Sequence, residues 1–82
     1  MNSLERLGFE LVKDEIVYGE REVAYMRTDH IITIAFKSLF DGEPFIQVIY
    51  GGGLLTNDEM LKINTAINEY WNENKDKFKR GE

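Results

Sequence analysis

Two apolar segments separated by a short turn constrain the fold of this chain more than any other feature. Residues 30–37 and 45–50 are dense in β-branched and aromatic side chains, which favour pleated strands. Asp41-Gly42, between them, is typical of a hairpin turn. A slip of one residue would move every side chain to the other face of the sheet, so only some pairings of these two strands can build a core.

The register of this hairpin is predicted from where its apolar side chains would lie. A two-residue turn at Asp41-Gly42 would place Phe36 opposite Gln47. A three-residue loop at Phe40-Asp41-Gly42, with its glycine in the left-handed position of a bulge, places Phe36 opposite Ile46. We predict the second register because it gathers a single apolar face. That face contains Ile32, Ile34, Phe36, Ile46, Val48 and Tyr50, and a reversal at Arg27-Thr28-Asp29-His30 adds Val23 and Tyr25.

The residues before this hairpin predict further strands of the same antiparallel sheet. Gly19-Glu20 fits a type II′ turn, because glycine readily adopts the positive φ of the first central position, and residues 23–27 run back as a strand. Upstream, residues 9–12 and 16–18 are apolar runs that predict either two small strands or one strand with a kink. The acid pairs Asp14-Glu15 and Glu20 with Glu22 fall in or beside the predicted turns, where acids usually serve solubility.

Helices are predicted at both ends of the chain. Asn2 or Ser3 caps a short helix that stops at Gly8. Thr56 and Glu59 form a capping box that starts a longer helix, from about Asn57 to about Lys75. Its apolar stripe would pack on the sheet and contains Met60, Ile63, Ile67 and Tyr70, with Trp71 beside them.

The predicted fold class is therefore α+β. It is an antiparallel β-meander of three or four strands with a short N-terminal helix and a long C-terminal helix packed on one face. The chain of 82 residues is long enough for one domain, 1–82, and residues 76–82 are expected to form a frayed basic tail.

Composition excludes several classes of function. Fifteen acids and 10 bases give a net charge of -5, which disfavours binding to nucleic acid. The absence of cysteine excludes disulfide frameworks and thiolate sites. No apolar stretch approaches the ~20 residues of a membrane span, and the charged start is unlike a signal peptide, so we expect a cytoplasmic protein with no membrane partner.

Two places could carry chemistry, and neither has a complete motif. Residues 51–53 form a glycine run between a strand and a helix, but no Lys-Ser/Thr pair follows it. His30 stands beside Asp29, as in the orienting half of many catalytic sites, but no nucleophile is placed near it. We therefore predict no catalytic residue, no metal site and no cofactor. A small ligand-binding domain or enzyme that uses His30 with Asp29, or residues 51–53, is the alternative prediction.

The second face of the predicted sheet is more apolar than a freely solvated surface. We expect it to be covered, either by the short N-terminal helix or by another subunit. The candidate interaction surface contains Met26, Ile31, Phe45, Ile49 and Trp71. The leading prediction is a non-enzymatic protein–protein interaction module, with a homodimer as one form of it, and its association would be lost on Phe45→Asp or Ile49→Asp.

Several spaced residues resemble a type of small phage protein. The pattern consists of Leu4-x-x-Leu7-Gly8-Phe9-Glu10, Tyr18-Gly19, Tyr25-x-Arg27, Ile32-x-Ile34-x-Phe36 and Glu59-Met60-Leu61-x-x-Asn64. It is similar to small uncharacterised proteins carried by phages and prophages of Gram-positive bacteria. The resemblance implies a meander of strands followed by one helix, and it implies no catalytic motif. The glycine run at 51–53 and the basic tail depart from the type.

Overall fold

A computed structural model describes residues 2–38 and 44–78, except the side chains of residues 38, 44 and 45. The elements follow one another as α1 (Ser3–Arg6), β1 (Glu10–Val17), β2 (Glu20–Arg27), the 3-10 turn η1 (Asp29–Ile31), β3 (Ile32–Ser38), β4 (Pro44–Tyr50), α2 (Asn57–Asn74) and the 3-10 turn η2 (Lys75–Phe78). Neither of the helices in these ranges is long and apolar enough to cross a membrane.

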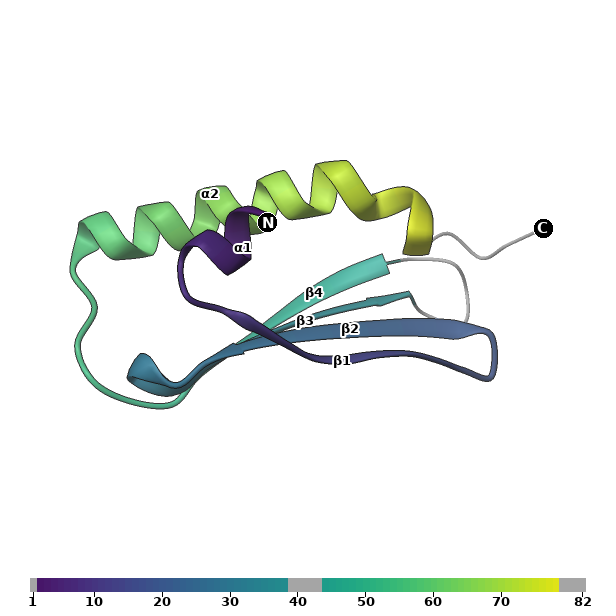
Figure 1. Cartoon of the computed structure of the whole chain (residues 1–82), viewed down its shortest axis with the longest axis horizontal. Helices are drawn as coiled ribbons and strands as arrows, with labels where there is room; N and C mark the ends of the chain where they lie inside the picture. The colour runs from purple at the N-terminus through teal and green to yellow at the C-terminus, as the bar shows by residue number, and fades with distance from the viewer. Residues whose placement is uncertain (1, 39–43, 79–82) are drawn as a thin grey trace.

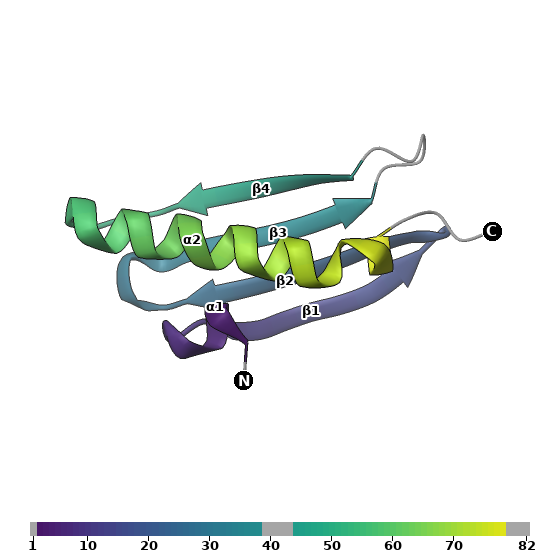
Figure 2. The same ribbon diagram turned by 90° about the horizontal axis from the view of Figure 1, so that it is seen from above.

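The four strands form one antiparallel meander in the order β1-β2-β3-β4. Both helices lie over the same face of this sheet, so the molecule has two layers (Figure 1). Seen from above, α2 crosses β2 and β3, and β4 lies out to one side of it (Figure 2). The predicted α+β fold is confirmed. We call the face under the helices the helix face and the opposite one the open face.

The predicted register of the central hairpin is also confirmed. Phe36 pairs with Ile46, and the two pairs beyond it are Ile34 with Val48 and Ile32 with Tyr50. The predicted loop at residues 40–42 lies outside the described residues. Between β2 and β3 the reversal contains residues 28–31 rather than 27–30, because Arg27 already pairs with Ile32. This shift by two positions in the pairing keeps Val23 and Tyr25 on the helix face.

The first hairpin differs from its prediction by one residue. Val17 pairs with Glu20, so the two central residues of the turn are Tyr18 and Gly19, with φ of 54° and 80°. Two positive φ angles define a type I′ turn, not the predicted type II′ turn at Gly19-Glu20. Residues 10–17 form a single strand with an irregularity between Leu11 and Lys13, which settles the open choice in favour of one kinked strand. Glu20 directly follows the turn, as predicted, whereas Asp14, Glu15 and Glu22 lie within the paired strands.

The core lies between the helix face and the apolar stripe of α2. Tyr70 of α2 contacts the ring of Phe36 at 4.5 Å between centroids and meets Tyr25 edge-on at 5.4 Å. Burial raises the pKa of the Tyr70 hydroxyl far above its usual value. The buried cluster contains Leu4, Phe9, Val23, Tyr25, Ile32, Ile34, Phe36, Ile63, Ala66, Ile67, Tyr70 and Phe78.

The end of the helix is more ordered than the sequence implies. Residues 76–78, assigned to a frayed tail, continue α2 as the turn η2, and Phe78 is fully buried. Its ring lies 5.4 Å from that of Trp71 and 6.3 Å from that of Phe36. The aromatic ring therefore anchors the last described turn to the sheet.

The N-terminal helix is held by a complete capping box. The Asn2 side chain accepts from the Glu5 amide at 2.8 Å, and the Glu5 carboxylate accepts from the Asn2 amide at 3.0 Å. Arg27 donates to the Leu7 carbonyl at 3.2 Å and lies over the Phe9 ring at 5.4 Å. These contacts fix α1 on the helix face, so it does not cover the open face as the sequence had allowed.

Candidate interaction surface

The structure brings together only part of the predicted interaction surface. Met26 of β2 and Ile49 of β4 lie on the open face, one on each side of Thr33 of β3, because both pair with it. Ile31 lies in η1 and is 58% exposed. Trp71 lies on the other side of the sheet, where its ring is parallel to that of Phe36 at 6.3 Å. The backbone of Phe45 pairs with Lys37, and its side chain lies outside the described residues.

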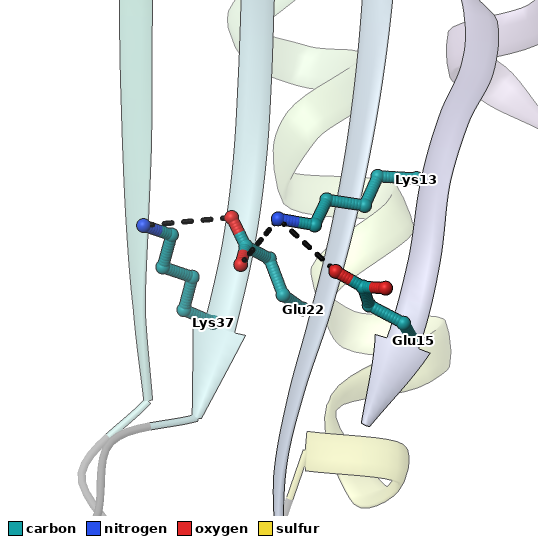
Figure 3. A network of polar contacts seen from close by, with 4 residues as sticks. All are labelled: Lys13, Glu15, Glu22 and Lys37. Carbon is teal, nitrogen blue, oxygen red and sulfur yellow. Dashed lines mark hydrogen bonds and ion pairs between the residues drawn. The ribbon is translucent and has the colours of Figure 1, made fainter. Parts of the chain in front are cut away.

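Another part of the open face carries charges, including acids that the sequence analysis assigned to positions in or beside turns. Lys13 lies 3.0 Å from Glu22 and 3.2 Å from Glu15, and Glu22 lies 3.5 Å from Lys37. These groups form a network across β1, β2 and β3 on the side away from the helices (Figure 3). The hydrogen bond from Lys13 lowers the pKa of the Glu22 carboxyl, and the same bond raises the pKa of Lys13. This half of the open face is solvated and needs no cover.

Exposed apolar side chains lie along both edges of the sheet. On β1 and its turn they are Leu11, Val12, Ile16, Val17 and Tyr18. The other set surrounds β4, which no helix covers (Figure 2), and we call it the β4 surface; its members, each exposed by about half or more, are Val48 (51%), Ile49 (53%), Tyr50 (47%), Leu54 (92%) and Met60 (51%). Val48 and Tyr50 point to the helix face and Ile49 to the open face, so the apolar surface continues around the edge of the sheet.

A hollow of about 340 Å³ opens on the helix-face side of the β4 surface. Its floor and walls come from β3, β4, the segment before α2 and the first turns of α2. The lining is almost entirely apolar and consists of Ile32, Val48, Tyr50, Gly53, Leu54, Leu55, Met60 and Ile63. A hollow of this size and chemistry fits one or two apolar side chains of a partner.

The backbone of β4 also offers unused hydrogen-bonding groups. The Gly51 amide donates to the Ile31 carbonyl at 2.8 Å, so the residue before it turns its amide the other way. Hydrogen-bonded and non-hydrogen-bonded pairs alternate in an antiparallel ladder. The N–H and C=O groups of Ile46, Val48 and Tyr50 therefore point away from β3, towards the open edge.

The two edges of the sheet differ in how they are protected. On the β1 edge, Asp14 and Ile16 point their backbone groups outward, because Val17 and Glu20 close a two-residue turn. That strand contains four acidic or basic residues and an irregular pairing, both of which hinder the addition of another strand. The sequence of β4, PFIQVIY, contains no acidic or basic residue, and its register with β3 is regular. β4 is thus the unguarded edge.

At the alternative site of His30 and residues 51–53 the backbone amides are already used, while the His30 Nδ1 atom is buried with no hydrogen-bond partner among the described residues. The Gly51 and Gly52 amides donate to the carbonyls of Ile31 and His30, so they are not available to an anion. The His30 ring packs on Gly53, where a Cβ atom would lie 2.6 Å from the imidazole Cδ2. No hydrogen bond or ion pair joins Asp29 to His30 in the described part of the chain, whose acids and imidazole form no metal-binding group.

Of the β4 surface the sequence analysis predicted only Ile49, because Val48 and Tyr50 were assigned to the apolar face on which the long helix packs. The pattern gives their facing correctly, but it does not say where α2 crosses the sheet. The one available signal is the contrast between an uncharged β4 and a charged β1.

No family model, curated protein or solved structure matches this chain. The function is therefore argued from the geometry of the described residues alone.

Proposed function

We propose that this chain is a non-enzymatic protein–protein interaction module of the cytoplasm, of phage or prophage type, and that it binds its partner through the β4 surface. The observation that carries the proposal is an unguarded sheet edge flanked by exposed apolar side chains and an apolar hollow. Strand addition at such an edge supplies backbone hydrogen bonds, and pockets beside the edge supply side-chain selectivity.

The mode of binding follows from the alternation of β4. An added antiparallel strand would pair with the outward groups of Ile46, Val48 and Tyr50. Every second side chain of that strand would point to the helix face, beside the hollow lined by Val48, Tyr50 and Leu54. The surface recognises an uncharged, extended segment, because neither β4 nor the lining of the hollow offers an acid or a base to a charged one.

A library of random seven-residue peptides, selected on the immobilised chain, tests this proposal. We expect enrichment of uncharged sequences with alternating apolar residues. Val48→Lys should abolish their binding, because it places a cation where an apolar strand would lie. The matched control is Val12→Lys: Val12 is a valine on β1 with 53% exposure, close to the 51% of Val48.

Two results would overturn the proposal. One is that no peptide is enriched on the wild-type chain. The other is that the enriched peptides bind Val48→Lys as tightly as they bind Val12→Lys, since the β4 surface would then not be the binding site.

A further inference from the structure

We infer that the partner of the β4 surface is a second copy of this chain, joined by antiparallel pairing of β4 with β4 around a two-fold axis at Val48. The inference rests on the proposed function and names the occupant of its surface. The exposed backbone and side chains of β4 are suited to pair with an extended, uncharged, apolar strand. The described part of the chain contains one such strand with an unused edge, and that strand is β4 itself.

Charge supports a second copy meeting at this edge. Each chain carries a net charge of -5, so two copies repel one another at most orientations. β4 contains no acidic or basic residue, and it is the edge at which two acidic copies can approach without placing carboxylates together. A partner attracted by opposite charge would instead be drawn to the acidic surface elsewhere.

The backbone fixes the register of the pairing. Within β4, only Ile46, Val48 and Tyr50 combine an outward carbonyl with an outward amide, because Pro44 has no N–H. When Val48 pairs with Val48 of the other copy, Ile46 pairs with Tyr50, and each of these residues exchanges both backbone hydrogen bonds. A two-fold axis at Gln47 would instead pair Pro44 with Tyr50, and the hydrogen bond that an amide at Pro44 would donate would be lost.

The side chains agree with this register. Residues opposite one another in an antiparallel pair share a face, so Ile46 of one copy would lie beside Tyr50 of the other on the helix face. Tyr50 lines the apolar hollow, and Ile46 of the second copy would cover its mouth. The same surface serves both copies, as a two-fold interface requires. The result is a continuous eight-stranded sheet, with the helices of both copies on one side.

The size of the β4 surface indicates a weak, reversible dimer. The five exposed fractions amount to on the order of 500 Å² of apolar side chain per copy, taking ~150–200 Å² for a large side chain. Stable standard-size interfaces bury about 800 Å² per partner, so the edge backbone must supply the rest. Dimerisation should therefore depend on protein concentration, and it should strengthen with added salt because salt screens the repulsion between two acidic copies.

A charge-swap experiment tests the two-fold axis. In sedimentation velocity across a wide concentration range, the wild-type chain and Val12→Lys should dimerise. Val48→Lys alone and Val48→Asp alone should remain monomeric, because each places like charges against one another at the axis. An equimolar mixture of Val48→Lys and Val48→Asp should dimerise again, since opposite charges now meet there.

A single-cysteine variant gives a second measurement that needs no charged side chain. The chain has no cysteine, so Val48→Cys can form a disulfide only between copies. Directly opposed residues in a hydrogen-bonded antiparallel pair lie about 5.5 Å apart at Cα, within the range that a disulfide spans. Val48→Cys should oxidise to a covalent dimer at least tenfold faster than the control, Val12→Cys.

The outcomes separate this inference from the proposed function. A wild-type chain that stays monomeric at millimolar concentration, or equal oxidation of the two cysteine variants, overturns the dimer. If peptides selected on the chain still require Val48 in that case, the β4 surface remains a binding site for another partner. If they do not, both the inference and the proposed function fail.

Discussion

Removing the Phe78 side chain should cost a large share of the stability of this domain. Phe78 is fully buried, and its ring contacts those of Trp71 and Phe36 at 5.4 and 6.3 Å. A buried Phe→Ala change costs about 3–5 kcal/mol through lost transfer energy and a cavity. We expect the lower end, ~3 kcal/mol, because η2 is a single short turn that can shift towards the gap.

The loss expected for Phe78→Ala is large compared with the total free energy of unfolding. A domain of this length has a free energy of unfolding of roughly 4–12 kcal/mol, so Phe78→Ala should lower the melting temperature by roughly 12–24 °C. Urea unfolding followed by fluorescence measures it, because Trp71 is the single tryptophan and lies against the Phe78 ring. Lys77→Ala, at an exposed neighbouring position, is the control and should change the stability by less than ~0.5 kcal/mol. A loss below ~1 kcal/mol for Phe78→Ala would refute the docking of η2 on the core.

Three further substitutions test other parts of the account. Gly53→Ala should lower the free energy of unfolding by about 1–3 kcal/mol, because φ at this residue is +77° and the added Cβ would meet His30. Gly52→Ala is the control and should lose far less, because its Cβ would meet open space and its φ is not positive. Equal losses of the two variants in thermal unfolding would contradict this reasoning. Tyr18→Asn should gain about 0.5 kcal/mol and Tyr18→Ala should not, since φ is 54° and asparagine tolerates that region; a gain from alanine would argue against backbone strain. The pKa of Glu22 is lowered in the folded state, so its contribution is present above its unfolded pKa and is lost as the pH falls through the folded one. The stability of wild type minus that of Glu22→Gln, from urea titrations, should therefore shrink to zero on acidification and also shrink with salt, and a difference that persisted at low pH would exclude the ionic network as its source.

The sequence predicts the fold well where side-chain alternation and register must agree. Phe36 can meet Ile46 rather than Gln47 only in one pairing of the central hairpin, so the facing of both strands follows from the pattern. The start of α2 is also predicted, although only half of the predicted capping box forms: the Thr56 hydroxyl accepts from the Glu59 amide at 3.1 Å, and among the described contacts the Glu59 carboxylate makes no bond to the Thr56 amide. These features depend on local spacing and on burial of one face, and both can be read from residue order.

The turns and the surface depend on information that residue order does not carry. A two-residue turn can consist of Tyr18-Gly19 or of Gly19-Glu20. The pairing of β1 with β2 decides between the two, and that pairing includes an irregularity that shifts the register of β1. Exposure at β4 depends on the line that α2 takes across the sheet, which leaves Val48 and Tyr50 half uncovered and buries Tyr70. Trp71 was grouped with residues of the open face, but it lies partly exposed on the helix face with its ring stacked on Phe36, because helical spacing alone does not fix how far a large ring reaches back to the sheet.

Amide hydrogen exchange by NMR at several protein concentrations tests the central claim most directly, that β4 is the edge at which this chain associates. In dilute solution the amides of Ile46, Val48 and Tyr50 should exchange faster than that of Ile49, which faces β3. As the concentration rises these three amides should gain protection, while the outward amides of Asp14 and Ile16 on the β1 edge stay unchanged. Protection that appears on β1 instead, or that rises equally along both edges, would contradict the account.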